Sequence, residues 1–269
     1  MKLSILSDEI SSDPVEAADL AADWGLKHFE LRMWHRWRAP AGMTDEDMLA
    51  VRKVWEDHGI DCPSISPGLF KLRPDDPVLK EHRGAFRDRC FDLAEAVGAR
   101  VVVLFPPLLN PGDRWWDWTP WMVEDFRATA QAAATRGLTL ALENEPACYA
   151  GVGQALAKLI AEINHPALRA NWDAGNHTYA TGEDFRKGYA ALRPYHVHTH
   201  VKDYAGRGSR ALPPGEGAVD WIGQLRALKD DGYKGFLVLE THFEPRIEGS
   251  RRCVQQMRGL LKQVSEEAE

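Results

Sequence analysis

The 269-residue sequence predicts a single-domain (β/α)8 TIM barrel over residues 1–269. Eight short apolar segments alternate with eight longer amphipathic segments, an order typical of parallel β/α folds. No linker, low-complexity tract or shift of composition marks a domain boundary. An open doubly wound sheet is the alternative, but it would usually carry a glycine-rich phosphate turn after the first strand, and Ser7-Asp8-Glu9 is not such a turn.

Each segment of the barrel has its own sequence signal. The apolar segments are predicted to be strands at Leu3–Leu6, His28–Leu31, Asp61–Ile65, Val101–Phe105, Leu138–Leu142, Leu168–Trp172, Tyr195–Thr199 and Phe236–Leu239. The amphipathic segments are predicted to be helices at Pro14–Trp24, Asp45–His58, Val78–Val97, Pro120–Arg136, Gly153–Ile163, Gly182–Leu192, Asp220–Lys229 and Ser250–Glu266. Glycines that follow helical segments are expected to adopt the left-handed cap conformation, at Gly25, Gly59, Gly98, Gly137 and Gly232.

Composition narrows the class of protein. With 44% hydrophobic residues the chain can bury a large core, and its formal charge of −7 argues against a nucleic-acid partner. Ser7-Asp8-Glu9 interrupts the N-terminal apolar segment, so we expect neither a signal peptide nor a membrane span. The cysteines are scattered without CxxC spacing, which favours reduced thiols and a cytoplasmic location, at Cys62, Cys90, Cys148 and Cys253.

Four successive predicted strands end on a residue able to bind metal: Glu143, Asp173, His200 and Glu240. In a TIM barrel, the functional site lies where the strands end. Three carboxylates and one imidazole suit one divalent cation, for which we favour Mn²⁺ over Mg²⁺, Co²⁺ or Zn²⁺. Any one of these residues could instead cap a helix or pair with an arginine, but the recurrence on four strands favours a metal site.

Short motifs near the strand ends add specificity through their order and spacing. They are Ser7-Asp8-Glu9-Ile10, Phe29-Glu30-Leu31-Arg32, Leu142-Glu143-Asn144, Trp172-Asp173-Ala174-Gly175-Asn176, His198-Thr199-His200-Val201-Lys202-Asp203, Pro214-Gly215-Glu216-Gly217, Val219-Asp220-Trp221 and Leu239-Glu240-Thr241. In these motifs the chain resembles, over nearly its whole length, the xylose isomerase-like TIM barrels, also called the sugar phosphate isomerase/epimerase family. The resemblance implies a dimer or tetramer.

The resemblance also implies roles for the strand-end residues. Glu143, Asp173, His200 and Glu240 would hold the metal, with His200 chosen because the family ligand begins a His-x-Lys-Asp element. Glu143 and Glu240 resemble the acid–base pair of a sugar isomerase or epimerase that converts a ketose through an enediolate. His198 shares the inward face and is a candidate substrate contact, whereas His196 is expected to pack one layer deeper.

Further candidate substrate contacts carry open alternatives. Lys71 could bind a substrate oxygen or be an exposed loop lysine, and Glu145 could support Glu143 or be a loop acid. Arg207 lies seven residues after His200, one residue farther than where some epimerases place a substrate-binding arginine. Asn176 stands where several ketose 3-epimerases carry a histidine, which weakens assignment to that group. Trp115 belongs to an aromatic cluster with Trp116, Trp118 and Trp121 that could wall the pocket, join subunits or anchor a loop. No phosphate cradle is visible, which favours an unphosphorylated sugar or polyol.

Three other functions compete with the isomerase. An inosose-type dehydratase, or another lyase acting on a keto-polyol, would use the same metal ligands. A barrel that only binds a ligand or a subunit would be expected to have lost one of them, and all four are present. A nuclease of the endonuclease IV type would need histidines at the ends of the second and third strands and a basic face, which this sequence lacks.

Overall fold

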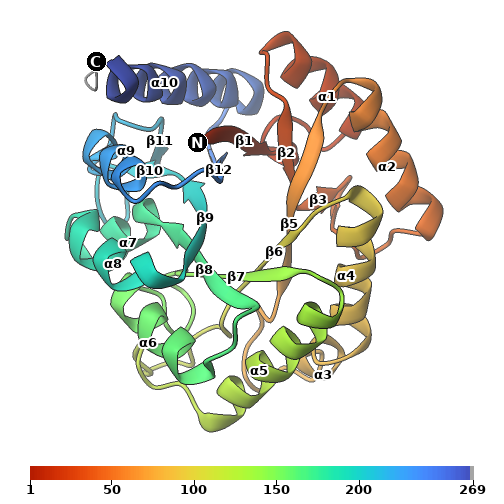
Figure 1. The fold of residues 1–269 in the computed structure, drawn as a ribbon, viewed down its shortest axis with the longest axis vertical. Coiled ribbons are helices and arrows are strands. Elements are labelled where there is room, and N and C mark those ends of the chain that lie inside the picture. Colours follow the sequence, from red (N-terminus) through yellow and green to blue (C-terminus); the bar gives the residue numbers. More distant parts are fainter. Residues whose placement is uncertain (267–269) are drawn as a thin grey trace.

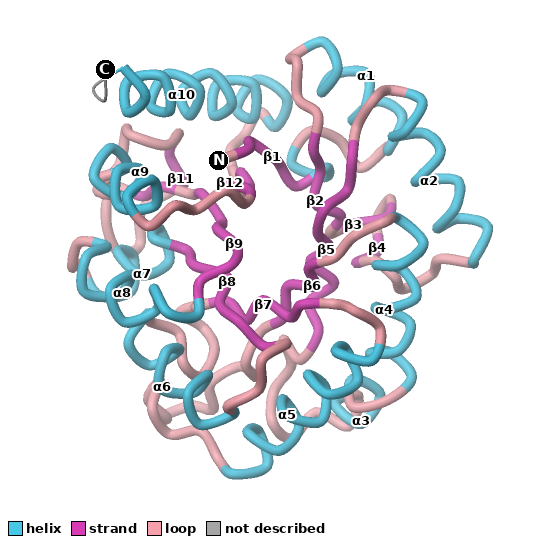
Figure 2. The backbone as a smooth tube through the Cα atoms, viewed as in Figure 1, coloured by secondary structure: helices cyan, strands magenta, loops and turns pink. Residues whose placement is uncertain are grey.

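The computed structural model describes residues 1–266 and confirms the predicted barrel (Figures 1 and 2). Eight parallel strands close in the order β1-β12-β9-β8-β7-β6-β5-β2. Their bounds are β1 Lys2–Leu6, β2 His28–Leu31, β5 Asp61–Leu69, β6 Val101–Leu104, β7 Thr139–Glu143, β8 Leu168–Asp173, β9 His196–Val201 and β12 Phe236–Leu239. Figure 2 shows the strands as an inner ring that the helices surround.

The helices lie outside the barrel and cover the outward faces of the strands. Their bounds are α1 Pro14–Asp23, α2 Asp45–Asp57, α3 Leu79–His82, α4 Ala85–Val97, α5 Pro120–Thr135, α6 Gly153–Ile163, α7 Ala174–Thr181, α8 Phe185–Leu192, α9 Trp221–Asp230 and α10 Arg246–Glu266, with 3₁₀ turns η1 Ser7–Glu9 and η2 Arg193–Tyr195. None of the helices in residues 1–266 is long and apolar enough to cross a membrane.

Helix α6 illustrates how the outer layer is held. Its buried residues include Leu156, Leu159, Ile160 and Ile163, whose spacing of three and four places them on one face. Burying each such side chain contributes roughly 1.5–3 kcal/mol. The N-terminal end of α6 lies close to the backbone of α8. A Cβ added to Gly153, the first residue of α6, would lie 2.6 Å from the Cα of Gly188 in α8.

Several predicted boundaries are wrong. The segment 78–97 is two helices, because Gly84 leaves the helical conformation at φ −140° and ψ −104°. The helix predicted to begin at Gly182 begins at Phe185. Helix α7, which precedes it, was not predicted, because its apolar residues do not form a clear stripe along one face. Helix α10 begins at Arg246 rather than Ser250. The glycine caps are confirmed, since φ lies between 66° and 80° at Gly25, Gly59, Gly98, Gly137 and Gly232.

Two hairpins extend beyond the barrel strands and were not predicted. The first pairs β3 Met33–Trp34 with β4 Trp37–Arg38, directly after β2. The second pairs β10 Asp203–Tyr204 with β11 Ala211–Leu212, after β9. Buried Asp203 holds the following loop, because its carboxylate accepts backbone N–H groups from Gly215, Gly217 and Val219. This explains the glycines of the Pro-Gly-Glu-Gly motif, since a Cβ on Gly217 would lie 2.2 Å from Asp203 Oδ1.

Candidate metal centre

The structure brings the four strand-end residues together. Glu143, Asp173, His200 and Glu240 lie on the adjacent strands β7, β8 and β9 and directly after β12 (Figure 1), and each offers a ligand atom within 4.8 Å of the others. In the β8–β9 register Asp173 lies opposite His200, whereas Glu143 lies opposite Asn171 and His200 lies opposite Val238, two residues before Glu240. All four side chains are buried, so they form a compact set of three carboxylates and one imidazole inside the mouth of the barrel.

Two neutral amides orient Glu143. Its Oε2 accepts a hydrogen bond from Asn171 Nδ2 at 3.0 Å, and its Oε1 accepts one from Asn176 Nδ2 at 3.1 Å. The same Oε2 lies 3.1 Å from His200 Nδ1. Asn176, predicted as a substrate contact, therefore lies against a predicted metal ligand. The sequence did not single out Asn171, although it lies two residues before Asp173 on the same strand.

Local structure holds Asp173 and leaves one of its carboxylate oxygens without a hydrogen bond. Its Oδ1 accepts the Asn176 N–H at 2.7 Å and so caps α7. Asn144 clamps the Asp173 backbone, donating to its carbonyl at 2.8 Å and accepting its N–H at 2.9 Å. Buried Oδ2 has no hydrogen-bond partner, although Lys202 Nζ lies 3.1 Å away. Burial raises the pKa of Asp173, against the nearby Lys202 ammonium, which lowers it.

His200 lies between the cluster and a further buried acid, Glu30 on β2. Its Nδ1 faces Glu143 and Glu240, and its Nε2 lies 2.8 Å from Glu30 Oε1. His198 Nε2 lies 2.7 Å from the other oxygen of Glu30. Although burial opposes its charge, Glu30 and Glu143 raise the pKa of His200 well above its ordinary value. Glu30 thus orients the imidazole across the barrel, in the way that carboxylates support metal-binding histidines.

Lys202 places a cation inside the cluster itself. Its ammonium lies 2.7 Å from Glu240 Oε2, 3.1 Å from Asp173 Oδ2 and 3.9 Å from Glu143 Oε1. Burial opposes its charge, but these carboxylates raise the pKa of Lys202 well above its ordinary value. The lysine is only 4% exposed, so it compensates buried negative charge.

Glu240 has two cationic partners in addition to His200 and Lys202, which also lie near Glu143. Its Oε1 accepts hydrogen bonds from Arg32 at 3.0 Å and from His242 Nε2 at 2.8 Å. Arg32 is itself paired with Asp8 and Glu9, both at 2.7 Å. Although burial raises it, Lys202 and the two histidine hydrogen bonds lower the pKa of Glu240 well below its ordinary value. His242 thus contacts a cluster carboxylate although its own side chain is partly exposed.

The cluster fits a divalent cation. Its donors are oxygens and one imidazole nitrogen, the set that borderline and hard divalent metals take. Asp173 Oδ2 is a buried carboxylate oxygen without a hydrogen bond, as expected of an atom reserved for another ligand. Lys202 shows that the site already attracts positive charge.

The other residues predicted to contact substrate differ in how exposed they are and in which residues they contact. Lys71 and Glu145 form a 2.7 Å ion pair with each other and are partly exposed. Trp115 donates from its indole to the Pro146 carbonyl at 3.0 Å, which ties the loop after β6 to the loop after β7. Arg207 is exposed in the loop that joins β10 and β11. His198, predicted as a substrate contact, is only 1% exposed, and its Nε2 contacts the carboxylate of Glu30.

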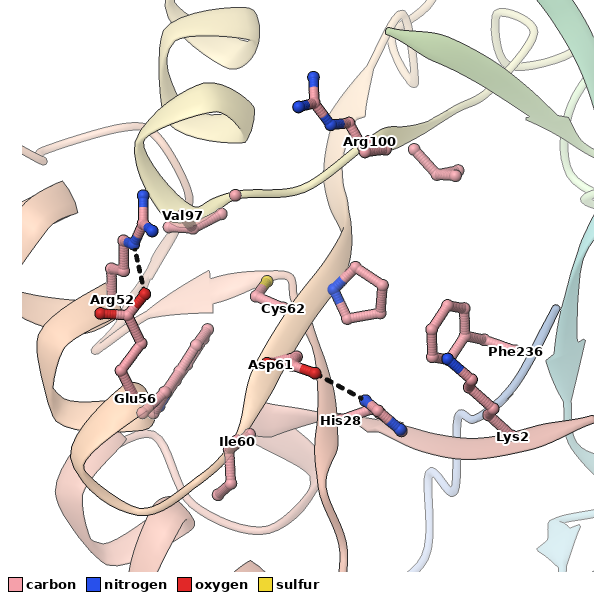
Figure 3. A pocket seen from close by; sticks show the side chains of 14 residues that line it. Lys2, His28, Arg52, Glu56, Ile60, Asp61, Cys62, Val97, Arg100 and Phe236 are labelled. Atoms are coloured by element: carbon pink, nitrogen blue, oxygen red, sulfur yellow. Dashed lines mark hydrogen bonds and ion pairs between the residues drawn. The ribbon is translucent and has the colours of Figure 1, made fainter.

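A cavity of about 410 Å³ lies at the opposite, N-terminal end of the strands. Figure 3 shows His28 pointing toward Asp61, with a 3.7 Å ion pair, and Lys2 beside Phe236. These residues lie at the start of β1, β2, β5 and β12, whereas the metal cluster lies where strands end. In TIM barrels the N-terminal end serves stability rather than chemistry.

Comparison with known proteins agrees with this architecture. A family model described as xylose isomerase-like TIM barrel matches residues 18–262. The chain belongs to the xylose isomerase-like TIM barrel family. No curated protein sequence matches this member.

Solved structures share the fold at low sequence identity. The probable 3-DHS dehydratase AsbF from Bacillus anthracis matches with a TM-score of 0.77 and 17% identity over 96% of this chain and 99% of that chain. L-Ribulose 3-epimerase matches with a TM-score of 0.78 and 15% identity over 100% and 97% of the two chains. The IolI protein with a bound zinc atom matches with a TM-score of 0.79 and 16% identity over 99% of both.

Proposed function

We propose that this family member is a divalent-metal-dependent sugar isomerase or epimerase. Glu143, Asp173, His200 and Glu240 would hold the metal. The observation that carries the proposal is the convergence of their four ligand atoms within 4.8 Å, with Asp173 Oδ2 lacking a hydrogen bond. The IolI structure with zinc supports a metal in this fold. Mn²⁺ remains our preferred metal, and a cytoplasmic homo-oligomer remains a prediction of the sequence.

The substrate would be a ketose or related keto-sugar. When bound, the metal supplies Lewis-acid stabilisation of the charge that develops on the substrate oxygens in an enediolate. Glu143 and Glu240 would remove and return the proton at the carbon beside the carbonyl. Two neutral amides hydrogen-bond to Glu143, which also lies near His200 and Lys202. Glu240 lies near the same two cations and also contacts Arg32 and His242. Because Arg32 and His242 contact Glu240 in addition to the cations that both glutamates share, and cations favour the ionised form of a carboxylate, we assign proton removal to Glu143.

Metal content and proton exchange test the proposal together. Purified protein and Glu143→Gln are analysed for metal, then incubated with Mn²⁺ and a panel of ketoses and keto-inositols in D₂O. We expect about one metal per wild-type chain and deuterium at the carbon beside the carbonyl. Glu143→Gln should reduce exchange by about 10²–10⁴-fold, the usual contribution of a general base. Glu248→Gln, which changes an exposed acid on α10, should behave as the wild type.

The products separate the competing chemistries. Exchange with retention of all hydroxyls supports isomerisation or epimerisation. Exchange that is followed by loss of water and formation of an enone would instead support the dehydratase alternative on the same site. A wild-type protein that binds none of Mn²⁺, Mg²⁺, Co²⁺ and Zn²⁺ would contradict the metalloenzyme and leave a binding barrel.

A further inference from the structure

The cations near the mouth of the barrel are nearly all neutralised. Arg32 pairs with Asp8, Glu9 and Glu240, and Lys71 pairs with Glu145. Lys202 lies among the cluster carboxylates.

Arg38 differs from these cations. Its guanidinium forms no ion pair with any carboxylate in the part of the chain that the structure describes, and its one hydrogen bond goes to the Ser66 carbonyl at 3.3 Å. Ionised side chains that are removed from water are normally paired, since leaving them unpaired costs free energy. Arg38 is half-buried, so its free guanidinium calls for a partner that the chain itself does not supply.

Arg38 lies at the C-terminal end of the barrel strands, the end that also holds the candidate metal cluster. It ends β4 in the hairpin after β2, and it packs on the C-terminal end of β5 at Ser66 and Gly68. A Cβ on Gly68, where φ is 75°, would lie 2.7 Å from Arg38 Cδ, so a larger residue there would displace the Arg38 side chain from this position. In the closed strand order β5 lies four strands from β9, on the opposite side of the barrel from His200.

The electrostatics place Arg38 within the field of the metal centre. Burial and the nearby Arg32 lower the pKa of Arg38, while Glu240, Asp8 and Glu143 partly oppose that shift. Arg38 therefore lies at the same mouth of the barrel as Glu143 and Glu240, beside the C-terminal end of β5. The interaction with these acids is not a contact, so the N–H groups of the guanidinium remain available.

We propose that Arg38 binds a carboxylate of the substrate, which makes the substrate an acidic hydroxyketone rather than a neutral sugar. The inference rests on the proposed function, because the hydroxyketone end would lie at the metal centre and the carboxylate would lie across the mouth. A guanidinium offers two parallel N–H groups that match the two oxygens of one carboxylate. A phosphate group carries more charge and more acceptor oxygens than one unpaired arginine satisfies.

Matched pairs of sugars test the inference. D-Fructuronate and D-fructose differ only in a carboxylate or a hydroxymethyl group at C6, as do D-tagaturonate and D-tagatose. Each is titrated calorimetrically into the Mn²⁺-loaded and the EDTA-treated protein. We expect at least one acid to bind about 10- to 100-fold more tightly than its neutral partner, the range for a hydrogen-bonded charged pair. Arg38→Gln should remove that preference without weakening the neutral sugar.

Two variants control for general charge and for folding. Arg36→Gln removes a cation from the same hairpin, where Arg36 is exposed and its guanidinium lies 5.0 Å from the Trp37 ring, and it should keep the preference. Arg38→Lys keeps the charge but loses the planar fork, so it should lose most of the preference. Circular dichroism and the unfolding midpoint show whether each variant is folded.

Three results would overturn the Arg38 assignment. They are equal binding of acid and neutral sugar by the wild type, a preference that survives Arg38→Gln, and no binding of either acid. D-Fructose 6-phosphate is tested as well. If it binds more tightly than D-fructuronate and this binding depends on Arg38, the partner of Arg38 is a phosphate and the carboxylate proposal is wrong. The proposed function fails separately, through absence of metal binding, because the EDTA-treated titrations still report on Arg38.

Discussion

Replacement of Lys202 by methionine should destabilise the metal-free protein strongly. Methionine matches the length of the lysine chain but removes the ammonium that lies 2.7 Å, 3.1 Å and 3.9 Å from carboxylate oxygens of Glu240, Asp173 and Glu143. Each attraction is on the order of 4–6 kcal/mol at an effective dielectric constant of ~20, before the cost of burying the lysine is subtracted. Removing one partner of such a buried network costs about 3–5 kcal/mol, because the remaining charges stay buried and unpaired.

Thermal and urea unfolding in EDTA measure this effect. A loss of that size lowers Tm by roughly 6–15 °C in a domain of this length. Added Mn²⁺ should raise the Tm of Lys202→Met more than that of the wild type, because a dication restores the missing positive charge. Lys187→Met is the matched control, since Lys187 is 74% exposed and only 3.4 Å from Glu183, and it should change stability by less than about 1 kcal/mol. Equal stability of Lys202→Met and wild type in EDTA would refute the reasoning.

The remaining predictions concern a supporting acid, a buried histidine and a close helix contact. Glu30→Gln should weaken metal binding about 10- to 100-fold by calorimetry, because it removes the carboxylate that orients the imidazole of His200, a proposed metal ligand. Buried His82 accepts a backbone N–H at Nδ1, and burial lowers its pKa to about 4, so the unfolded chain binds the extra proton between pH 4 and 6.5. The free energy of unfolding should therefore rise with pH across that window, by at most about 1.4 kcal/mol per pH unit, and this slope should diminish in His82→Asn. Gly153→Ala should cost about 1–3 kcal/mol by urea unfolding, because its Cβ would lie 2.6 Å from the backbone of α8, whereas Gly259→Ala in α10 meets nothing within 4 Å.

Specific outcomes would contradict each of these three. They are unchanged metal affinity in Glu30→Gln, a pH slope that persists in His82→Asn, and equal losses in the two glycine variants. Gly259→Ala, at an exposed position of α10, should instead raise the free energy of unfolding by up to about 1 kcal/mol, because alanine favours the helix more than glycine does.

The barrel and its four strand-end residues were predictable from the sequence because both follow from local pattern. Apolar segments of strand length alternate with helical segments, and closure of parallel strands brings their C-terminal ends to one mouth. Glu143, Asp173, His200 and Glu240 each end a strand, so their proximity needed no knowledge of side-chain contacts. Helix boundaries were less accurate, because the break at Gly84 and the start of α7 depend on tertiary contacts and on a side-chain cap.

His196 shows where the alternation of a strand fails as a guide. Period two would place it on the inward face with His198 and His200, but the β8–β9 register shifts between Ala170 and Asn171. Its ring packs 4.5 Å from that of Tyr233 and 5.6 Å from that of Tyr189 in α8. A register shift is set by how two strands pair, which neither strand's own sequence reveals.

The sequence by itself determined the barrel, its closure and the set of carboxylates and imidazole at one end, because these depend on residue order along single strands. Only the tertiary structure decided that Glu30 supports His200 from across the barrel, that Lys202 lies within the acid cluster, and that Arg38 is left without an acid. Glu30 and His200 are 170 residues apart, and such pairings arise from strand register and closure. The charge balance of the mouth is therefore a property of the folded barrel. It distinguishes Glu240 from Glu143, and among residues 1–266 it leaves Arg38 without a carboxylate partner.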